Sequence, residues 1–188
     1  SDEYIKLYSG LFYRMKGICF RDKSSCNLLS DLSNIRFAPD VVLNLRYDGE
    51  KQYKKYYNNY YVISMINLSN RKELCAYKNI YERKIAEIAF EIIRNGSNVV
   101  LMSFCDKEGD LESAFTIKSL LKGKEDHIEI YSHKFIEESL GVIAHANGIV
   151  ATRLHAMILA FVFNIPVFPI IYSEKMANVI KDYSFCNR

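Results

Sequence analysis

The sequence predicts an α/β fold in which a parallel sheet is covered by helices on both faces. The first observation is an alternation: from about residue 60 onward, short apolar runs alternate with segments whose apolar residues recur at helical spacing. The second is composition. The chain has 188 residues, 49% of them hydrophobic and 25% charged, so it can bury the core of one domain and an additional piece.

Five runs are expected to form the strands: YYVISMIN (60–67), NVVLMSF (98–104), HIEIY (127–131), GIVAT (148–152) and IPVFPI (165–170). Helices are expected between and after them: 80–95, with Gly96 just past its end, 111–121, a helix carrying Phe135, Ile136, Leu140 and Ile143, then 154–163, and one starting near Glu174. Ser132 and Thr152 are expected to cap the third and fourth of these helices. The alternation predicts a Rossmann-like domain over residues 62–188.

The first 45 residues have a similar character but do not complete a domain. A strand-like run at 17–21 precedes a short amphipathic helix at 22–32, which indicates the remnant of an N-terminal Rossmann-like domain over 1–45. Residues 46–61 form the connection and contain six tyrosines. We favour a solvated connection over a basic, aromatic platform for a glycan or lipid head group, because no motif supports the platform.

Charge and composition exclude several classes of protein. The net charge is only +3, and no basic stripe could follow a phosphate backbone, so we expect no nucleic-acid partner. No apolar run reaches the roughly 18 residues of a transmembrane segment. The five cysteines are scattered and never spaced as Cys-x-x-Cys, which is typical of reduced thiols in a cytoplasmic protein. No signal peptide is visible at the start.

Metal binding is not expected either. The acidic stretch Asp106, Glu108 and Asp110 is interpreted as a loop and helix start. The four histidines are not at metal-ligand spacing: His127, His133, His145 and His155.

Arg153 and His155 interrupt an otherwise apolar stretch, residues 148–168. A buried charge is costly unless it is paired, so these side chains are expected at the rim of the sheet rather than in its core. The strand before them ends at Thr152, and ligands of open parallel sheets bind at the carboxyl ends of strands, beside helix N-termini that favour anions. The alternative for Arg153 is an ion pair with Glu137 or Glu138, and for His155 a structural position at a helix end.

Arg21 and Lys175 also follow expected strands. Arg21 could instead pair with Asp22, and Lys175 could be an ordinary exposed lysine. If both converge with Arg153 and His155, the cluster would suit a small, highly charged substrate such as a phosphorylated carboxylate.

Three segments together resemble the polysaccharide pyruvyl transferase family: FRDKSS (20–25), ATRLHAMILAFVFNIPVF (151–168) and YSEK (172–175). Their common pattern is Arg-Asp-x-x-Ser, an Arg-Leu-His turn that opens an apolar helix, a strand after Pro, and a Lys soon after. The resemblance covers roughly residues 15–185 in order. The Arg-Leu-His element is its most specific part.

The resemblance implies a two-domain fold similar to GT-B glycosyltransferases. It implies transfer of pyruvyl from phosphoenolpyruvate to a sugar hydroxyl pair of a cell-surface polysaccharide or glycan precursor, which can be lipid-linked, forming a ketal without a cofactor. His155 would be catalytic, and Arg21, Arg153 and Lys175 would bind phosphoenolpyruvate. Family members are usually longer, so we expect most of the N-terminal domain to be absent here, and an incomplete, inactive fragment is an alternative to an active enzyme.

Two alternatives stay open beside this interpretation. One is a GT-B-type nucleotide-sugar glycosyltransferase, although the turn ATRLHAM lacks the carboxylate that would hold a ribose. The other is a non-catalytic, glycan-binding fragment. The expected location is the cytoplasm, either free or peripheral at the inner face of the membrane.

Overall fold

The computed structural model describes residues 2–47 and 59–182. The chain forms two compact units, Asn44–Ile170 and the combination of Ser1–Leu43 with Ile171–Arg188. The second unit therefore contains the last helix, which the sequence assigns to the C-terminal domain. The predicted domain bounds stay a prediction, and each unit is described separately below.

The larger unit is built on a five-stranded sheet in which every neighbouring pair is parallel. The strand order is β5-β4-β3-β6-β7. Their bounds are β3 (Tyr60–Ser64), β4 (Asn98–Ser103), β5 (Ile128–Ser132), β6 (Gly148–Ala151) and β7 (Val167–Pro169). The five expected strands all form, each within one residue of its predicted range or inside it.

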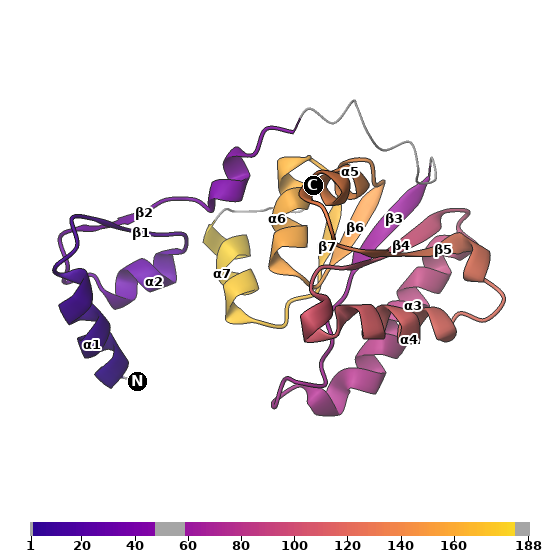
Figure 1. Ribbon diagram of the computed structural model, residues 1–188, viewed down its shortest axis with the longest axis horizontal. Helices are drawn as coiled ribbons and strands as arrows, with labels where there is room; N and C mark the ends of the chain where they lie inside the picture. Colours follow the sequence, from indigo (N-terminus) through magenta and orange to yellow (C-terminus); the bar gives the residue numbers. More distant parts are fainter. Residues whose placement is uncertain (1, 48–58, 183–188) are drawn as a thin grey trace. The chain divides into compact units, whose positions relative to one another are not determined.

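Helices lie on both faces of this sheet (Figure 1). On one face, α3 (Lys78–Arg94) and α4 (Asp110–Ser119) bury a core that includes Ile63, Leu101 and Val150 from three neighbouring strands. The other face carries α5 (Ile136–Ala144) and α6 (Leu154–Val162), and there Tyr60 donates its hydroxyl proton to the Val142 carbonyl at 2.7 Å. Since side chains alternate along a strand, Tyr60 and Ile63 point to opposite faces. The predicted Rossmann-like α/β fold is confirmed.

The described residues of the larger unit also contain three short 3₁₀ turns: Cys75–Tyr77, Asp106–Glu108 and Glu125–His127. The acidic stretch thus forms a loop and a helix start, as predicted.

The residues that cap the helices agree only in part with the predicted caps. Gly96 has a φ of +83°, and the bonds from its N–H to Ile93 and from the Ser97 N–H to Ile92 form a Schellman motif after α3, as predicted. The predicted cap at Ser132 is wrong, because Phe135 precedes α5 and the Ser132 hydroxyl donates to Asp106 at 2.7 Å. The Thr152 cap is also wrong, since Arg153 occupies the N-cap position of α6.

The smaller unit contains a two-stranded parallel sheet of β1 (Ile18–Phe20) and β2 (Ile35–Phe37). Asp22 caps α2 (Lys23–Leu28) by accepting from the Ser25 N–H at 2.7 Å. This helix is shorter than the one predicted at 22–32. The Lys23 N–H donates to Asp182 at 2.8 Å and so joins α2 to α7 (Glu174–Asp182). The unit also contains α1 (Asp2–Phe12), and the 3₁₀ turn Val41–Asn44 follows β2.

The tyrosine-rich connection is described only at its two ends, because residues 48–58 lie outside the described residues. Tyr47 packs its ring 5.6 Å from that of Phe163, and Tyr60 and Tyr61 belong to β3. None of the helices in the described ranges has both the length and the apolar character that crossing a membrane requires.

Candidate functional site

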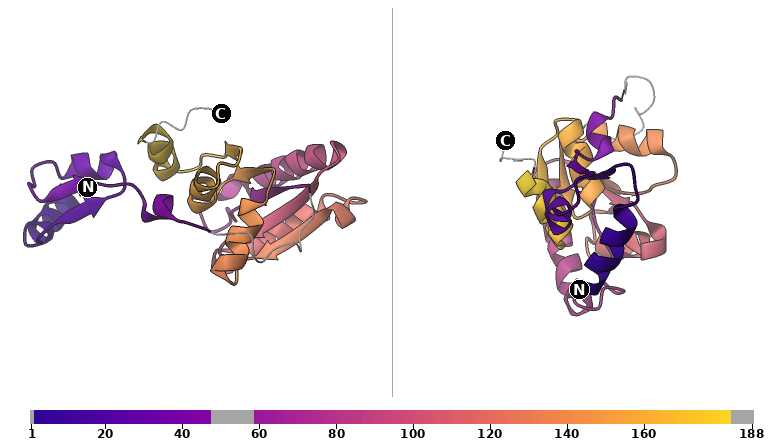
Figure 2. Two further views of the ribbon diagram at one scale, coloured as in Figure 1. Left: turned by 90° about the horizontal axis from the view of Figure 1, so that it is seen from above. Right: turned by 90° about the vertical axis from the view of Figure 1, so that its left-hand side faces the viewer.

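The order in which the chain adds strands to the sheet reverses between the neighbouring strands β3 and β6. From β3 it proceeds to β4 and β5 on one side, and then returns to place β6 and β7 on the other side (Figure 1; Figure 2 gives two further views of the same ribbon). Ligands of open parallel sheets bind outside the carboxyl ends of the strands at such a reversal. The Thr152 N–H donates to the Ser64 carbonyl at 2.9 Å, which ties the carboxyl ends of β6 and β3 together. Arg153 follows directly, so it lies at this reversal point.

Arg153 is held by two carboxylates from the loop after β4. Its Nε donates to Asp110 Oδ2 at 2.9 Å, its Nη2 donates to the other oxygen of Asp110, and its Nη1 donates to Glu108 Oε2 at 2.8 Å. The expectation of an ion pair is met, but Glu137 and Glu138 are the wrong partners. They lie in the first turn of α5, after the edge strand β5.

The Arg153–Asp110 pair is nearly closed to solvent. The Asp110 side chain is fully buried and that of Arg153 is 15% exposed. Burial by itself would lower the pKa of Arg153, but the hydrogen bonds and charges of Asp110 and Glu108 raise that pKa above its ordinary value. Arg153 is therefore a fixed cation at any physiological pH.

Gly109 lets the two carboxylates reach Arg153. Its φ of +85° belongs to the left-handed region, and an added Cβ would lie 2.6 Å from Asn67 Nδ2. Asn67 donates from this nitrogen to the Gly109 carbonyl at 3.2 Å, and its Oδ1 accepts from the Ser69 N–H at 2.8 Å. The loop after β3 thus fixes the turn that carries Glu108 and Asp110.

His155 is the second residue of α6, and its side chain is exposed. The backbone N–H groups of this first turn have no partner within the helix, and the helix dipole makes the surroundings favourable for an anion. The other three histidines bond to nearby groups through Nδ1: His127 to Asn98, His133 to Ser139 and His145 to the Gly141 carbonyl. His155 lies in the first turn of α6, two residues after Arg153.

Tyr81 forms a hydrogen bond to Thr152, the residue that follows β6. Its hydroxyl bonds to Thr152 Oγ1 at 2.9 Å and accepts from the Ile66 N–H at 3.2 Å. Burial raises the pKa of Tyr81 to about 12, so the phenol stays neutral across the physiological range. Tyr81 is not among the candidate residues that the sequence predicts.

Replacing Tyr81 by Phe should lower the free energy of unfolding by about 1–3 kcal/mol, because Thr152 Oγ1 and the Ile66 N–H would lose a buried partner. Urea denaturation measures the change. Tyr77→Phe is the matched control, since Tyr77 is 57% exposed and should tolerate the change. Equal stabilities of the Tyr81 and Tyr77 variants would contradict the supporting role.

Arg21 and Lys175 both belong to the smaller unit. Arg21 follows β1 and pairs with Asp40 at 2.7 Å rather than with Asp22, which is occupied in capping α2. Lys175 is the exposed second residue of α7. The structure brings Arg153 together with Asp110 and Glu108, while the convergence of Arg21 and Lys175 with Arg153 and His155 stays a prediction.

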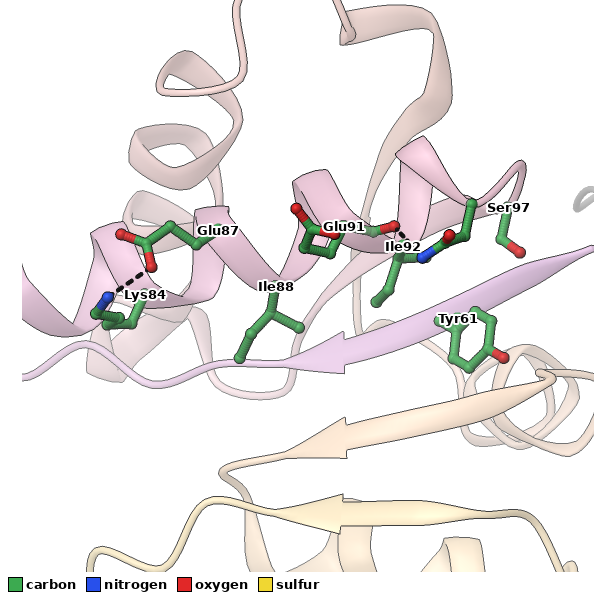
Figure 3. A pocket seen from close by; sticks show the side chains of 8 residues that line it. Tyr61, Lys84, Glu87, Ile88, Glu91, Ile92 and Ser97 are labelled. Carbon is green, nitrogen blue, oxygen red and sulfur yellow. Dashed lines mark hydrogen bonds and ion pairs between the residues drawn. The ribbon is translucent and has the colours of Figure 1, made fainter.

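A groove of about 630 Å³ lies elsewhere on the larger unit, between α3 and β3. Figure 3 shows Ile88 and Ile92 of α3 above Tyr61 of β3, with Lys84 and Glu87 paired at the rim. It contains no candidate residue from the sequence. Its other end, at Ser97, lies where β4 begins, so the groove extends to the amino edge of the sheet. Arg153 and the N-terminus of α6 lie at the opposite edge.

The fold and the charged strand ends define a class of α/β proteins whose ligand site faces the carboxyl edge of a parallel sheet. The family model of polysaccharide pyruvyl transferases matches residues 1–174 of the 188, and the chain belongs to this family. It is thus a transferase of polysaccharide biosynthesis with a sugar acceptor, as the resemblance implied. The match includes Arg21, Arg153 and His155 and ends one residue before Lys175. No curated protein matches this chain significantly.

Proposed function

We propose that the chain transfers pyruvyl from phosphoenolpyruvate to a hydroxyl pair of a sugar in a cell-surface polysaccharide or glycan precursor, forming a ketal. One observation carries the proposal: a fixed arginine at the N-cap of α6 and an exposed histidine in its first turn lie at the reversal point of the sheet. A trianionic donor requires fixed cations, and its chemistry requires a group that moves protons near neutral pH.

Arg153 has N–H groups left with which to bind phosphoenolpyruvate. A guanidinium has five N–H groups, and three of them are engaged by Asp110 and Glu108. One N–H on each terminal nitrogen can therefore meet a carboxylate or phosphate of the donor. The helix N-terminus adds backbone N–H groups for the same anion. The family resemblance is the basis on which Arg21 and Lys175 are proposed as further phosphoenolpyruvate-binding residues.

The reaction balances with one histidine as the proton carrier. A sugar hydroxyl adds to C2 of phosphoenolpyruvate while C3 gains a proton and becomes the methyl group. A second hydroxyl then forms a bond to C2 as the C2–O bond to phosphate breaks, and its proton leaves with the phosphate. His155 can deliver the proton to C3 and accept one from a hydroxyl, because an imidazole ring can both donate and accept a proton. The proposed reaction uses no cofactor.

The test compares ligands and then turnover. Calorimetry with phosphoenolpyruvate and with a uridine diphosphate sugar separates the proposal from a nucleotide-sugar transferase. Phosphate release that depends on a glycan acceptor then separates an enzyme from a glycan-binding protein. We expect phosphoenolpyruvate to bind and the nucleotide sugar not to bind. We also expect phosphate to be released only when the glycan acceptor is present. Binding of the nucleotide sugar alone would contradict the proposal.

A further inference from the structure

Two arginines from different loops meet on one carboxylate oxygen. Arg153 Nη1 lies 2.8 Å from Glu108 Oε2, and Arg71 Nη2 lies 3.2 Å from the same oxygen. Arg71 is in the loop after β3, Glu108 follows β4, and Arg153 follows β6. Since β4, β3 and β6 are neighbours in the sheet, the three side chains gather at the same carboxyl edge.

The two acidic residues beside Arg153 are held very differently. Asp110 is fully buried, binds Arg153 through both oxygens and also accepts from the Cys105 N–H at 3.0 Å. Glu108 is 51% exposed, and a single oxygen makes both of its ion pairs. Exposed ion pairs contribute little to stability because water competes for both charges. Asp110 is therefore a permanent partner of Arg153, whereas Glu108 can be exchanged for another anion at low cost.

We propose that Glu108 occupies, in the ligand-free protein, the position of an anionic group of the donor, and that Arg71 is a second arginine that binds this group. The proposal rests on the proposed function for the identity of the donor. On binding, the phosphate or carboxylate of the donor replaces the Glu108 carboxylate between Arg71 and Arg153. Neither arginine has to move far, because both already point at one oxygen.

The charge balance explains why the exchange favours an anion. With Glu108 in place, the formal charges of Arg71, Arg153, Glu108 and Asp110 sum to zero. When Glu108 leaves, the remaining three groups carry one positive charge beside the N-terminus of α6, where the helix dipole also attracts anions. A donor anion with more than one charge competes better for the two arginines than a single carboxylate does. Displacing Glu108 costs the same free energy for every anion, so Glu108 weakens the binding of each of them by the same factor.

The test uses calorimetry of phosphoenolpyruvate and of inorganic phosphate on the whole chain. Glu108→Gln keeps the shape of the side chain and removes its charge, so both ligands should bind about tenfold more tightly. Arg71→Gln should weaken both by about tenfold. The matched controls are Glu91→Gln and Arg94→Gln, because that exposed pair lies at the end of α3, just before β4 begins and thus at the opposite edge of the sheet. Both controls should leave binding unchanged.

The outcomes separate this inference from the proposed function. If phosphoenolpyruvate binds but the Glu108 and Arg71 variants behave as their controls do, the inference is wrong and the function stands. If phosphate binding shifts as expected in both variants while phosphoenolpyruvate binds no better than phosphate, the inference stands and the donor is wrong. If neither ligand binds to any variant, both are wrong.

Discussion

Replacing Arg153 by Met is expected to lower the free energy of unfolding by about 3–5 kcal/mol, the cost of leaving a buried charge without its partner. Asp110 would keep its carboxylate at a fully buried position, where among the described residues the Cys105 N–H is the remaining hydrogen-bond donor to it. The methionine fills much of the volume of the arginine stem, so the loss reports the charge rather than a cavity. Urea denaturation followed by circular dichroism measures the change.

Two further variants identify the cause of this loss. Arg153→Met combined with Asp110→Asn should recover a large part of the lost stability, because the buried group is then neutral. Arg94→Met removes an exposed arginine paired with Glu91 and should change the free energy of unfolding by about 0.5 kcal/mol or less. If Arg153→Met behaves as Arg94→Met does, Asp110 is not a buried charge in solution.

Replacing His155 by Asn should lower kcat by about 10²- to 10⁴-fold, the usual contribution of general acid–base catalysis. Asparagine keeps the size and some hydrogen bonding of histidine but cannot exchange a proton near neutrality. KM for phosphoenolpyruvate should change less, because Arg153 and its carboxylate partners are unaffected. The measurement is acceptor-dependent phosphate release between about pH 5 and 9, where an ordinary histidine titrates.

The matched control for this variant is His127→Asn. His127 is also exposed, but it precedes β5 and therefore lies at the amino edge of the sheet. Its replacement should leave kcat and the pH profile unchanged. A His155→Asn enzyme with a normal kcat and an unchanged pH profile would show that another group moves the proton.

The fold could be predicted from the sequence because its signals are local. Apolar runs of strand length alternate with helical spacing, and Gly96 ends α3 through a conformation that glycine adopts easily. The caps were predicted less well. Ser132 is a good capping residue by type, but its hydroxyl is used by Asp106, which the chain brings near only after folding.

The candidate site was predicted only in part, because local sequence patterns do not determine the order of the strands in a sheet. The start of α6 at Arg153 and His155 follows from the end of an apolar strand. The partner of Arg153 cannot be inferred from such a local pattern. Glu137 and Glu138 are nearer in sequence, but they follow the edge strand, whereas Asp110 follows β4, which is separated from β6 only by β3. The reversal between β3 and β6 decides the pairing.

The grouping of both ends of the chain into one unit has a consequence for the order of folding. Residues 44–170 are continuous and can fold as soon as they are synthesised. The hydrogen bond between Lys23 and Asp182 instead closes a loop of 159 residues, and loop-closure entropy slows the formation of such distant contacts. Folding of residues 44–170 shortens the distance that this loop must span. The smaller unit is therefore expected to form last in refolding experiments, after the parallel sheet.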